Sequence, residues 1–207
     1  MKKKSIFIYF FILLFITPQI SNGKTKIDEK ILFTPYFLQK TSLFFKESNR
    51  YTESYVGIGI NTSILLNLII LEGFFETIRL VGISKNLGSY YNTVFPESGE
   101  RSGYSLGSQL GLAFLTSHEN LFITSFGLDY INIGNLNYQK TEYNIKYKKL
   151  LYTFSITDRF LLFKEAILYT GVRFSFNKDK EGSPLYKGYE EFNNYLITLS
   201  IGISFWL

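Results

Sequence analysis

The sequence predicts an all-β fold, an eight-stranded antiparallel up-and-down transmembrane β-barrel. Three observations lead to this prediction. Apolar and polar residues alternate with a period of two in one segment after another. The polar register carries mostly Gly, Ser, Thr, Asn and Gln, which fits a narrow lumen better than a charged, solvated surface. Longer polar connections alternate with shorter ones, as external loops and periplasmic turns do in such barrels.

The composition excludes several other classes of protein. The chain has 207 residues, of which 46% are hydrophobic and 18% aromatic, with no cysteine and one histidine. The aromatic content rules out intrinsic disorder, and the lack of cysteine rules out disulfides and thiolate metal sites. A mean hydropathy of only +0.06 disfavours a bundle of membrane helices, because each span needs about 20 mostly apolar residues.

Residues 1–23 have the layout of a secretory signal peptide. Three lysines at positions 2 to 4 precede an apolar run over 6–16, and the small residues Ser21 and Gly23 suit a cut after position 23. An uncleaved anchor helix is the alternative, but the run is too short to span a bilayer comfortably. The expected organisation is therefore a signal peptide at 1–23, a short N-terminal periplasmic segment at 24–30 and a barrel at 31–207.

The alternation is clearest at the C-terminus. From Tyr195 to Leu207, every second residue is large and apolar, whereas Thr198, Ser200 and Gly202 lie on the other register. No amphipathic helix has this pattern, so we expect a strand with Ile197, Leu199, Ile201 and Ile203 facing lipid. Similar patterns predict eight strands near 31–45, 53–66, 71–84, 103–116, 121–134, 146–157, 166–177 and 192–207.

The connections predict which end of the barrel faces outward. Segments 85–102, 135–145 and 178–191 are polar and loop-like, and short links such as 117–120 lie between them. We expect the long loops outside the cell and both termini in the periplasm, which places the protein in a bacterial outer membrane.

The uncharged stretch Ser54 to Leu71 is nearly long enough for a helical span. Its glycines and the alternation of its first half favour two strands joined by a hairpin turn instead. The sequence leaves two positions open for that turn, Asn67 or Glu72-Gly73.

The last residues resemble the C-terminal assembly signal of small bacterial outer-membrane barrels of the OmpA/OmpX type. Ser200, Gly202, Phe205 and Leu207 occupy the polar, glycine, aromatic and terminal hydrophobic positions of that signal, although Phe is more usual than Leu at the end. The resemblance covers the architecture of roughly 30–207. It implies two partners, outer-membrane lipid and the outer-membrane assembly machinery, and implies no specific activity or extracellular ligand.

Charge and chemistry point away from nucleic acid and from catalysis. Removal of 1–23 leaves 19 basic and 17 acidic side chains, and the one basic cluster, at 146–149, fits a solvated strand end. Lipid-modifying barrels of this type use a histidine with a serine near the outer rim, but His118 lies in a predicted periplasmic turn. No metal spacing and no phosphate loop is present in the sequence. We therefore expect no enzyme, no metal and no cofactor.

A charge cluster in the lumen is the last expectation. Arg79, Gln109, Asp129 and Arg173 fall on the predicted polar registers at broadly similar heights. Because a charge in a narrow lumen is costly unless it is paired, we expect two arginines around Asp129, with trapped water as the alternative. An eight-stranded barrel is filled by its own side chains. The predicted function is therefore an outer-membrane barrel that acts through its surface loops, in adhesion or envelope integrity; a small pore or, less favoured, a lipid-modifying enzyme is the alternative.

Overall fold

A computed structural model describes residues 30–46, 49–87, 90–94, 101–117, 120–134, 136–138, 141–143, 147–163, 166–176 and 193–207. The proposed signal peptide and His118 lie outside these ranges. The strands are β1 (Lys30–Lys46), β2 (Asn49–Leu66), β3 (Ile69–Leu87), β4 (Tyr90–Val94), β5 (Ser102–Ser117), β6 (Asn120–Ile133), β7 (Leu136–Tyr138), β8 (Thr141–Tyr143), β9 (Tyr147–Phe163), β10 (Ala166–Phe176) and β11 (Asn193–Trp206). Among the described residues, no helix has the length and apolar character needed to cross a membrane.

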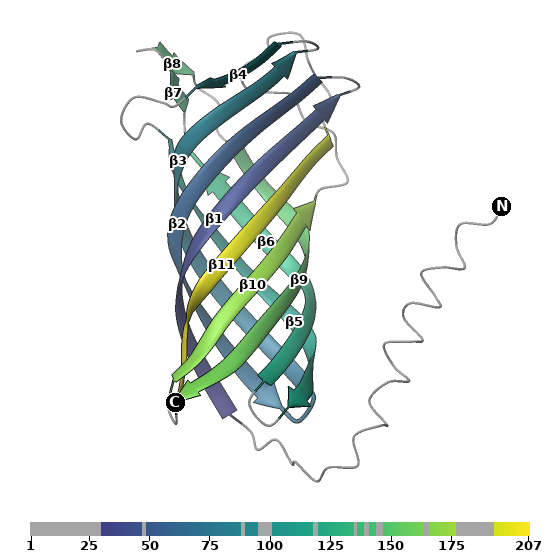
Figure 1. The fold of residues 1–207 in the computed structure, drawn as a ribbon. Helices are drawn as coiled ribbons and strands as arrows, with labels where there is room; N and C mark the ends of the chain where they lie inside the picture. The colour runs from purple at the N-terminus through teal and green to yellow at the C-terminus, as the bar shows by residue number, and fades with distance from the viewer. Residues whose placement is uncertain are drawn as a thin grey trace, which may run out of the picture.

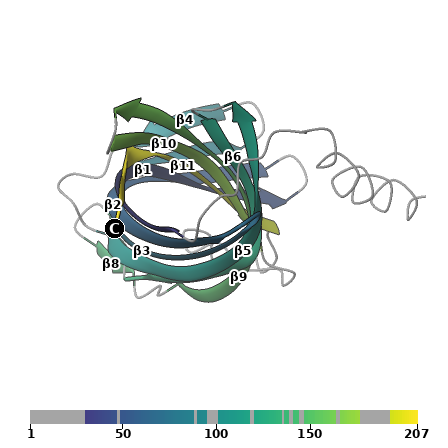
Figure 2. The ribbon, with the colours of Figure 1, turned by 90° about the horizontal axis from the view of Figure 1, so that it is seen from below.

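Eight of these strands close into a barrel. Around the wall the order is β1, β2, β3, β5, β6, β9, β10 and β11, with every pair antiparallel, and β11 pairs with β1 to complete the ring (Figure 2). The predicted eight-stranded up-and-down barrel is therefore confirmed. β4 extends only the end of β3, and β7 pairs with β8 in a separate hairpin. These three short strands lie at the end of the barrel opposite the C-terminus (Figure 1).

The hairpin between β2 and β3 turns at Asn67. Leu66 pairs with Ile69, and Asn67 has a φ of 55°. Asparagine tolerates this left-handed conformation better than most side chains, which suits it to a two-residue hairpin turn. The second candidate turn, Glu72-Gly73, lies inside β3 instead.

The first connection at the opposite end is shorter than the sequence suggested. Backbone pairing between β1 and β2 continues to Lys46 and Asn49, so that only 47–48 separate the strands. The sequence predicted strands at 31–45 and 53–66, with residues 46–52 as the connection between them, and this connection is too long. Apolar and polar residues alternate only weakly near 46–52, so the pattern did not show that the strands continue to Lys46 and from Asn49.

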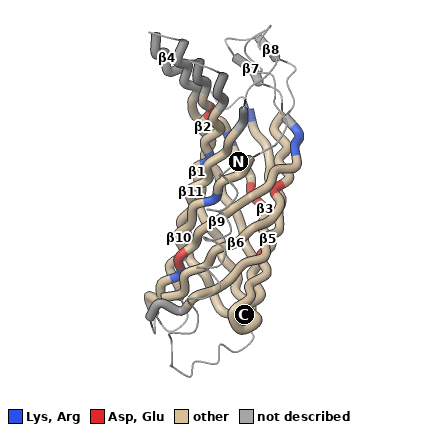
Figure 3. The backbone as a smooth tube through the Cα atoms, turned by 90° about the vertical axis from the view of Figure 1, so that its right-hand side faces the viewer, with Lys and Arg blue, Asp and Glu red and all other residues tan. Residues whose placement is uncertain are grey.

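Large apolar side chains cover the outer wall. In β11, Ile201 is 56% exposed, whereas Thr198 is 1% and Ser204 0% exposed, as the alternation predicts. The other barrel strands have the same two faces, and charged residues are sparse along them (Figure 3). An apolar outer surface of this extent is suited to hydrocarbon rather than to water.

Glycines on the inner face make room for aromatic rings on neighbouring strands. Gly59 pairs directly with Tyr36, and a Cβ at Gly59 would lie 2.5 Å from the ring of Tyr36. Gly107 pairs with Phe74, whose ring would lie 2.2 Å from a Cβ at that position. These close approaches require glycine, and they let large rings fill the interior of a narrow barrel.

Candidate functional site

The interior of the barrel holds a balanced set of buried charges. Four cations and four anions with described side chains are buried, each at most 8% exposed; they are Lys40, Arg101, Arg159, Arg173, Glu53, Glu72, Glu76 and Asp129. They come from six of the eight strands and from the residue that precedes β5. A buried charge is costly without a partner, and these charges pair with one another.

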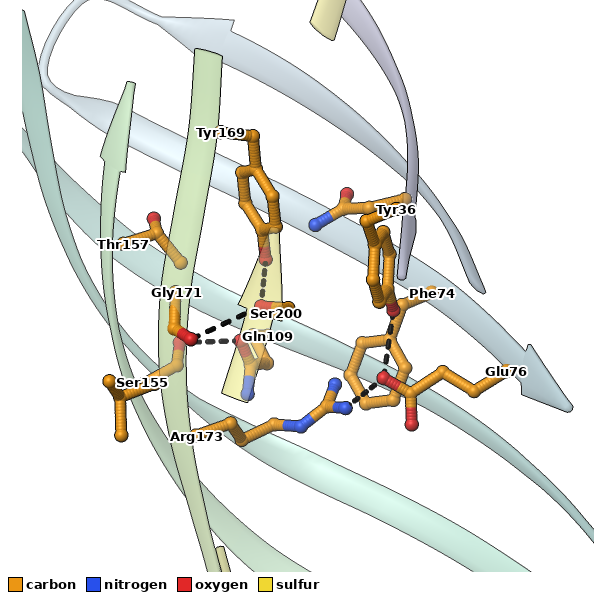
Figure 4. Close-up of a pocket in the computed structure, with 12 residues that line it drawn as sticks. Tyr36, Phe74, Glu76, Gln109, Ser155, Thr157, Tyr169, Gly171, Arg173 and Ser200 are labelled. Carbon is orange, nitrogen blue, oxygen red and sulfur yellow. Dashed lines mark hydrogen bonds and ion pairs between the residues drawn. The ribbon is translucent and has the colours of Figure 1, made fainter. Parts of the chain in front are cut away.

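Glu76 is the centre of the largest cluster. Its carboxylate accepts a hydrogen bond from the Tyr36 hydroxyl at 2.8 Å and forms an ion pair with Arg173 (Figure 4). It also accepts a hydrogen bond from Lys40 Nζ at 2.8 Å. The guanidinium of Arg173 also lies 3.8 Å from the ring centroid of Phe74, within the range of a cation–π contact. Side chains of β1, β3 and β10 thus meet across the lumen.

Asp129 extends this cluster toward β6. It accepts a hydrogen bond from the hydroxyl of Ser105, and its second oxygen lies 3.7 Å from Lys40 Nζ. Lys40 therefore lies between two carboxylates and is nearer to Glu76.

A second cluster surrounds Glu72. Its carboxylate lies 2.8 Å from Nη2 of Arg159 and accepts hydrogen bonds from Ser63 at 3.2 Å and Ser125 at 3.1 Å. The same Arg159 nitrogen donates to Ser63 at 2.7 Å. Glu72 is on β3 and Arg159 on β9, so this cluster also spans the lumen.

A third ion pair lies at the end of the barrel where β5 begins. Arg101 Nη1 is 2.6 Å from Glu53, and Arg101 Nε donates to the carbonyl of Gly134 at 3.1 Å. Glu53 also accepts a hydrogen bond from Tyr55. Because Arg101 precedes β5 and Gly134 follows β6, this side chain ties together the ends of two barrel strands.

The predicted lumenal residues are only partly brought together. Gln109, Asp129 and Arg173 are buried in the interior. Gln109, however, bonds to Thr153 at 2.8 Å and Ser155 at 2.7 Å, and Arg173 pairs with Glu76 rather than with Asp129. The expected pairing of two arginines with Asp129 is therefore wrong. Arg173 pairs with Glu76, and the cation beside Asp129 is Lys40.

Arg79 requires a second correction. It is exposed on the outer wall, where its backbone pairs with Val56 and Ser102. Strand β3 places Glu72 and Glu76 inside, and a residue three positions after Glu76 must then face outward. Glu72 and Glu76 lie four residues apart and so share one face of the strand, which indicates that Arg79 belongs to the other face. The sequence prediction placed Arg79 on the inner face instead.

The sequence reasoning missed six of the eight interior charges. Each lies on the inward register of its strand or directly beside a barrel strand, and the missed residues are Lys40, Glu53, Glu72, Glu76, Arg101 and Arg159. For Arg159 the signal was available, since it continues the inward series of Thr153, Ser155 and Thr157.

The interior leaves little open space beside the Glu76 cluster. A cavity lined by Tyr36, Gln109, Thr157, Tyr169 and Arg173, among others, gives the centre of a water molecule about 10 Å³ of room (Figure 4). That is close to the minimum for one water molecule. Within the described ranges, no group of three histidine, cysteine or acidic side chains is placed to hold a metal ion.

Of the proposed assembly signal, Ser200 and Gly202 lie on the inward register of β11, and Phe205 and Leu207 are exposed on the outer wall. β11 is also the strand that closes the ring against β1. Recognition of these residues by assembly machinery stays a prediction.

No family model matches the sequence, and no curated protein is similar to it. Solved structures do match the fold. Neisserial surface protein A aligns with a TM-score of 0.54 and 10% identity over 84% of this chain and 96% of its own. The outer membrane protein OprG from Pseudomonas aeruginosa aligns with a TM-score of 0.53 and 9% identity over 86% of this chain and 96% of its own. The fold is that of the small bacterial outer-membrane barrels. At this identity the likeness establishes the architecture alone, and the residues that fill the lumen must be interpreted from this chain itself.

Proposed function

We propose that this protein is an integral outer-membrane barrel with a closed interior, which acts without catalysis by presenting its loops at the cell surface, in adhesion or in envelope integrity. The observation that carries the proposal is the set of ion pairs across the lumen. Glu76 and Glu72 each bind a cation from a strand that is not their neighbour, and Glu53 on β2 binds Arg101, which directly precedes β5. A lumen crossed by such pairs is a rigid support rather than a passage.

The orientation follows from the two ends of the barrel. At the end with the C-terminus, the strands are joined over 67–68, 118–119 and 164–165. At the other end, three of the four connections are longer, and they include β4 and the β7–β8 hairpin. Long connections outside and tight turns in the periplasm are the rule for such barrels. We therefore place both ends of the barrel-forming chain on the periplasmic side.

A small pore remains the second candidate, because one observation favours it. Thr157 and Arg173 line the cavity, and neither Thr157 Oγ1 nor Arg173 Nε has a hydrogen-bond partner among the residues that the structure describes. Buried polar atoms are commonly satisfied by ordered water, so this part of the lumen is suited to hold water. A water site of this size does not amount to a continuous path.

Two measurements test the proposal. Protein reconstituted into planar bilayers should show no stable conductance; stable, large conductance would favour the pore. Protease added to intact cells should cut within 85–102 and 178–191, and should spare the periplasmic turns. Cleavage at 164–165 in intact cells would reverse the proposed orientation.

A further inference from the structure

Two exposed cations lie on the outer wall near the loop end of the barrel. Arg79 of β3 and Lys148 of β9 both occupy outward registers. β5 and β6 lie between these strands, so the two residues are three strand spacings apart, about 14 Å measured along the curved wall. Arg79 lies two residues nearer the loop end of β3 than Thr77, which shares the row of Lys148. Neither forms an ion pair with any residue that the structure describes.

Aromatic and polar side chains fill the surface between the two cations. Tyr104 pairs with Asn132, and Asn132 pairs with Lys148, which makes one continuous row across β5, β6 and β9. The ring of Tyr104 lies 6.3 Å from that of Phe75 and 6.4 Å from that of Tyr130. Tyrosines of this kind concentrate at the level of lipid headgroups.

The height of this surface matches the edge of the apolar band. β5 begins at Ser102 and β6 ends at Ile133, so Arg79 and Tyr104 lie beside the ends of the barrel strands. Toward the opposite end, the outward residues of β5, β6 and β9 include the exposed leucines 106, 110, 128 and 150. The cations are therefore placed where hydrocarbon gives way to headgroups on the loop side.

The charge on this surface is of one sign. Among the outward residues with described side chains, the acidic one is Asp158, which lies ten residues beyond Lys148 along β9, toward the periplasmic end. Arginine binds phosphate through paired N–H groups, and lysine binds it as a point charge. Because Arg79 and Lys148 face away from the lumen at the level of the headgroups, the phosphate that they would meet is that of a lipid.

We infer that Arg79 and Lys148, with Tyr104 and Asn132 between them, form a binding surface for the phosphate-bearing headgroup of an outer-leaflet lipid. This inference rests on the proposed membrane insertion and goes beyond it by naming a lipid class and the residues that select it. The basic cluster at 146–149, which the sequence assigned to a solvated strand end, thereby acquires a lipid-binding role through Lys148.

The test compares two spin-labelled lipids around the inserted protein. Protein isolated from membranes is reconstituted in phosphatidylcholine vesicles that contain spin-labelled phosphatidic acid or spin-labelled phosphatidylcholine, and the immobilised fraction of each is measured by electron paramagnetic resonance. We expect wild type to prefer phosphatidic acid. The double variant Arg79→Gln with Lys148→Gln should lower that preference by at least roughly fivefold.

Lys30 provides the control. It is an exposed cation at the opposite end of the barrel, on the inward register of β1 and 4.5 Å from the ring of Trp206. Lys30→Gln removes one positive charge, as each substitution of the double variant does, and should leave the preference for phosphatidic acid unchanged. An unchanged preference in the double variant, or a loss in Lys30→Gln alone, overturns the inference. Displacement of phosphatidic acid by millimolar inorganic phosphate would indicate a free-phosphate site and also overturn it.

Insertion is measured separately by the heat-dependent shift of the folded barrel on a gel. Wild type that does not insert overturns the proposed function together with this inference. Wild type that inserts without any preference for phosphatidic acid overturns the inference alone.

Discussion

Lys40 Nζ lies 2.8 Å from Glu76 Oε2, although β2 separates the strands that carry these residues. Both side chains are completely buried. The contact is possible because the wall curves, which brings side chains of β1 and β3 toward the same axis. Glu76 is thus shared between Lys40 and Arg173, and its loss affects both cations.

Glu76→Gln should lower the free energy of unfolding by about 3–5 kcal/mol, because it leaves two buried cations without their shared counter-charge. Urea titration in lipid vesicles measures the change. The neighbouring outward variant Thr77→Val is the control and should change stability by less than about 0.5 kcal/mol. Equal effects of the two substitutions would contradict the importance of the ion pairs.

Arginine should be tolerated unequally at two adjacent positions of β11. Ile201→Arg places a charge on the lipid-facing wall and should cost about 2–4 kcal/mol at the bilayer midplane, with a smaller cost toward the interface. Ser200→Arg places the same side chain inside, where it competes for space with Tyr169 and Gly171. A folding titration in which only the inward change is harmful would contradict the assignment of the faces.

Gly59→Ala should lower the free energy of unfolding by about 1–3 kcal/mol, because its methyl group would collide with the ring of Tyr36. Gly73→Ala is the matched control, since nothing lies within 4 Å of a Cβ at that position. The two variants make the same chemical change in paired strands. Thermal unfolding of both in one detergent should rank Gly59→Ala well below Gly73→Ala.

Deletion of residues 205–207 should impair membrane insertion in cells. It shortens β11, whose pairs with β1 include Phe33–Phe205, and it leaves backbone groups of β1 and β10 unpaired. Each unpaired group in hydrocarbon costs several kcal/mol. Fractionation of cells that express the truncated chain gives the result, with Trp206→Phe as a full-length control. Normal insertion of the truncated chain would show that the barrel does not need the last residues of β11 to enter the membrane.

The sequence predicts the wall of this barrel better than its interior. Alternation in β11 is local information, so Ile201 and Thr198 could be assigned to opposite faces from the chain alone. The partners of a lumenal charge are not local. Asp129 and Arg173 were both predicted inside, but which acid meets Arg173 depends on the tilt of the strands and the stagger of the ring. Arg79 shows a different failure, since its register was readable from Glu72 and Glu76 but was assigned incorrectly.

The ion pairs of the interior constrain how the barrel can enter a membrane. Lys40 and Glu76 belong to β1 and β3, with only β2 between them, whereas Arg173 belongs to β10 and reaches Glu76 only when β11 has closed on β1. An open sheet in hydrocarbon would carry Arg173 without Glu76, together with an unbonded edge. The charge of Arg173 is therefore neutralised by Glu76 only on edge closure, and we expect half-inserted forms of this chain to be short-lived.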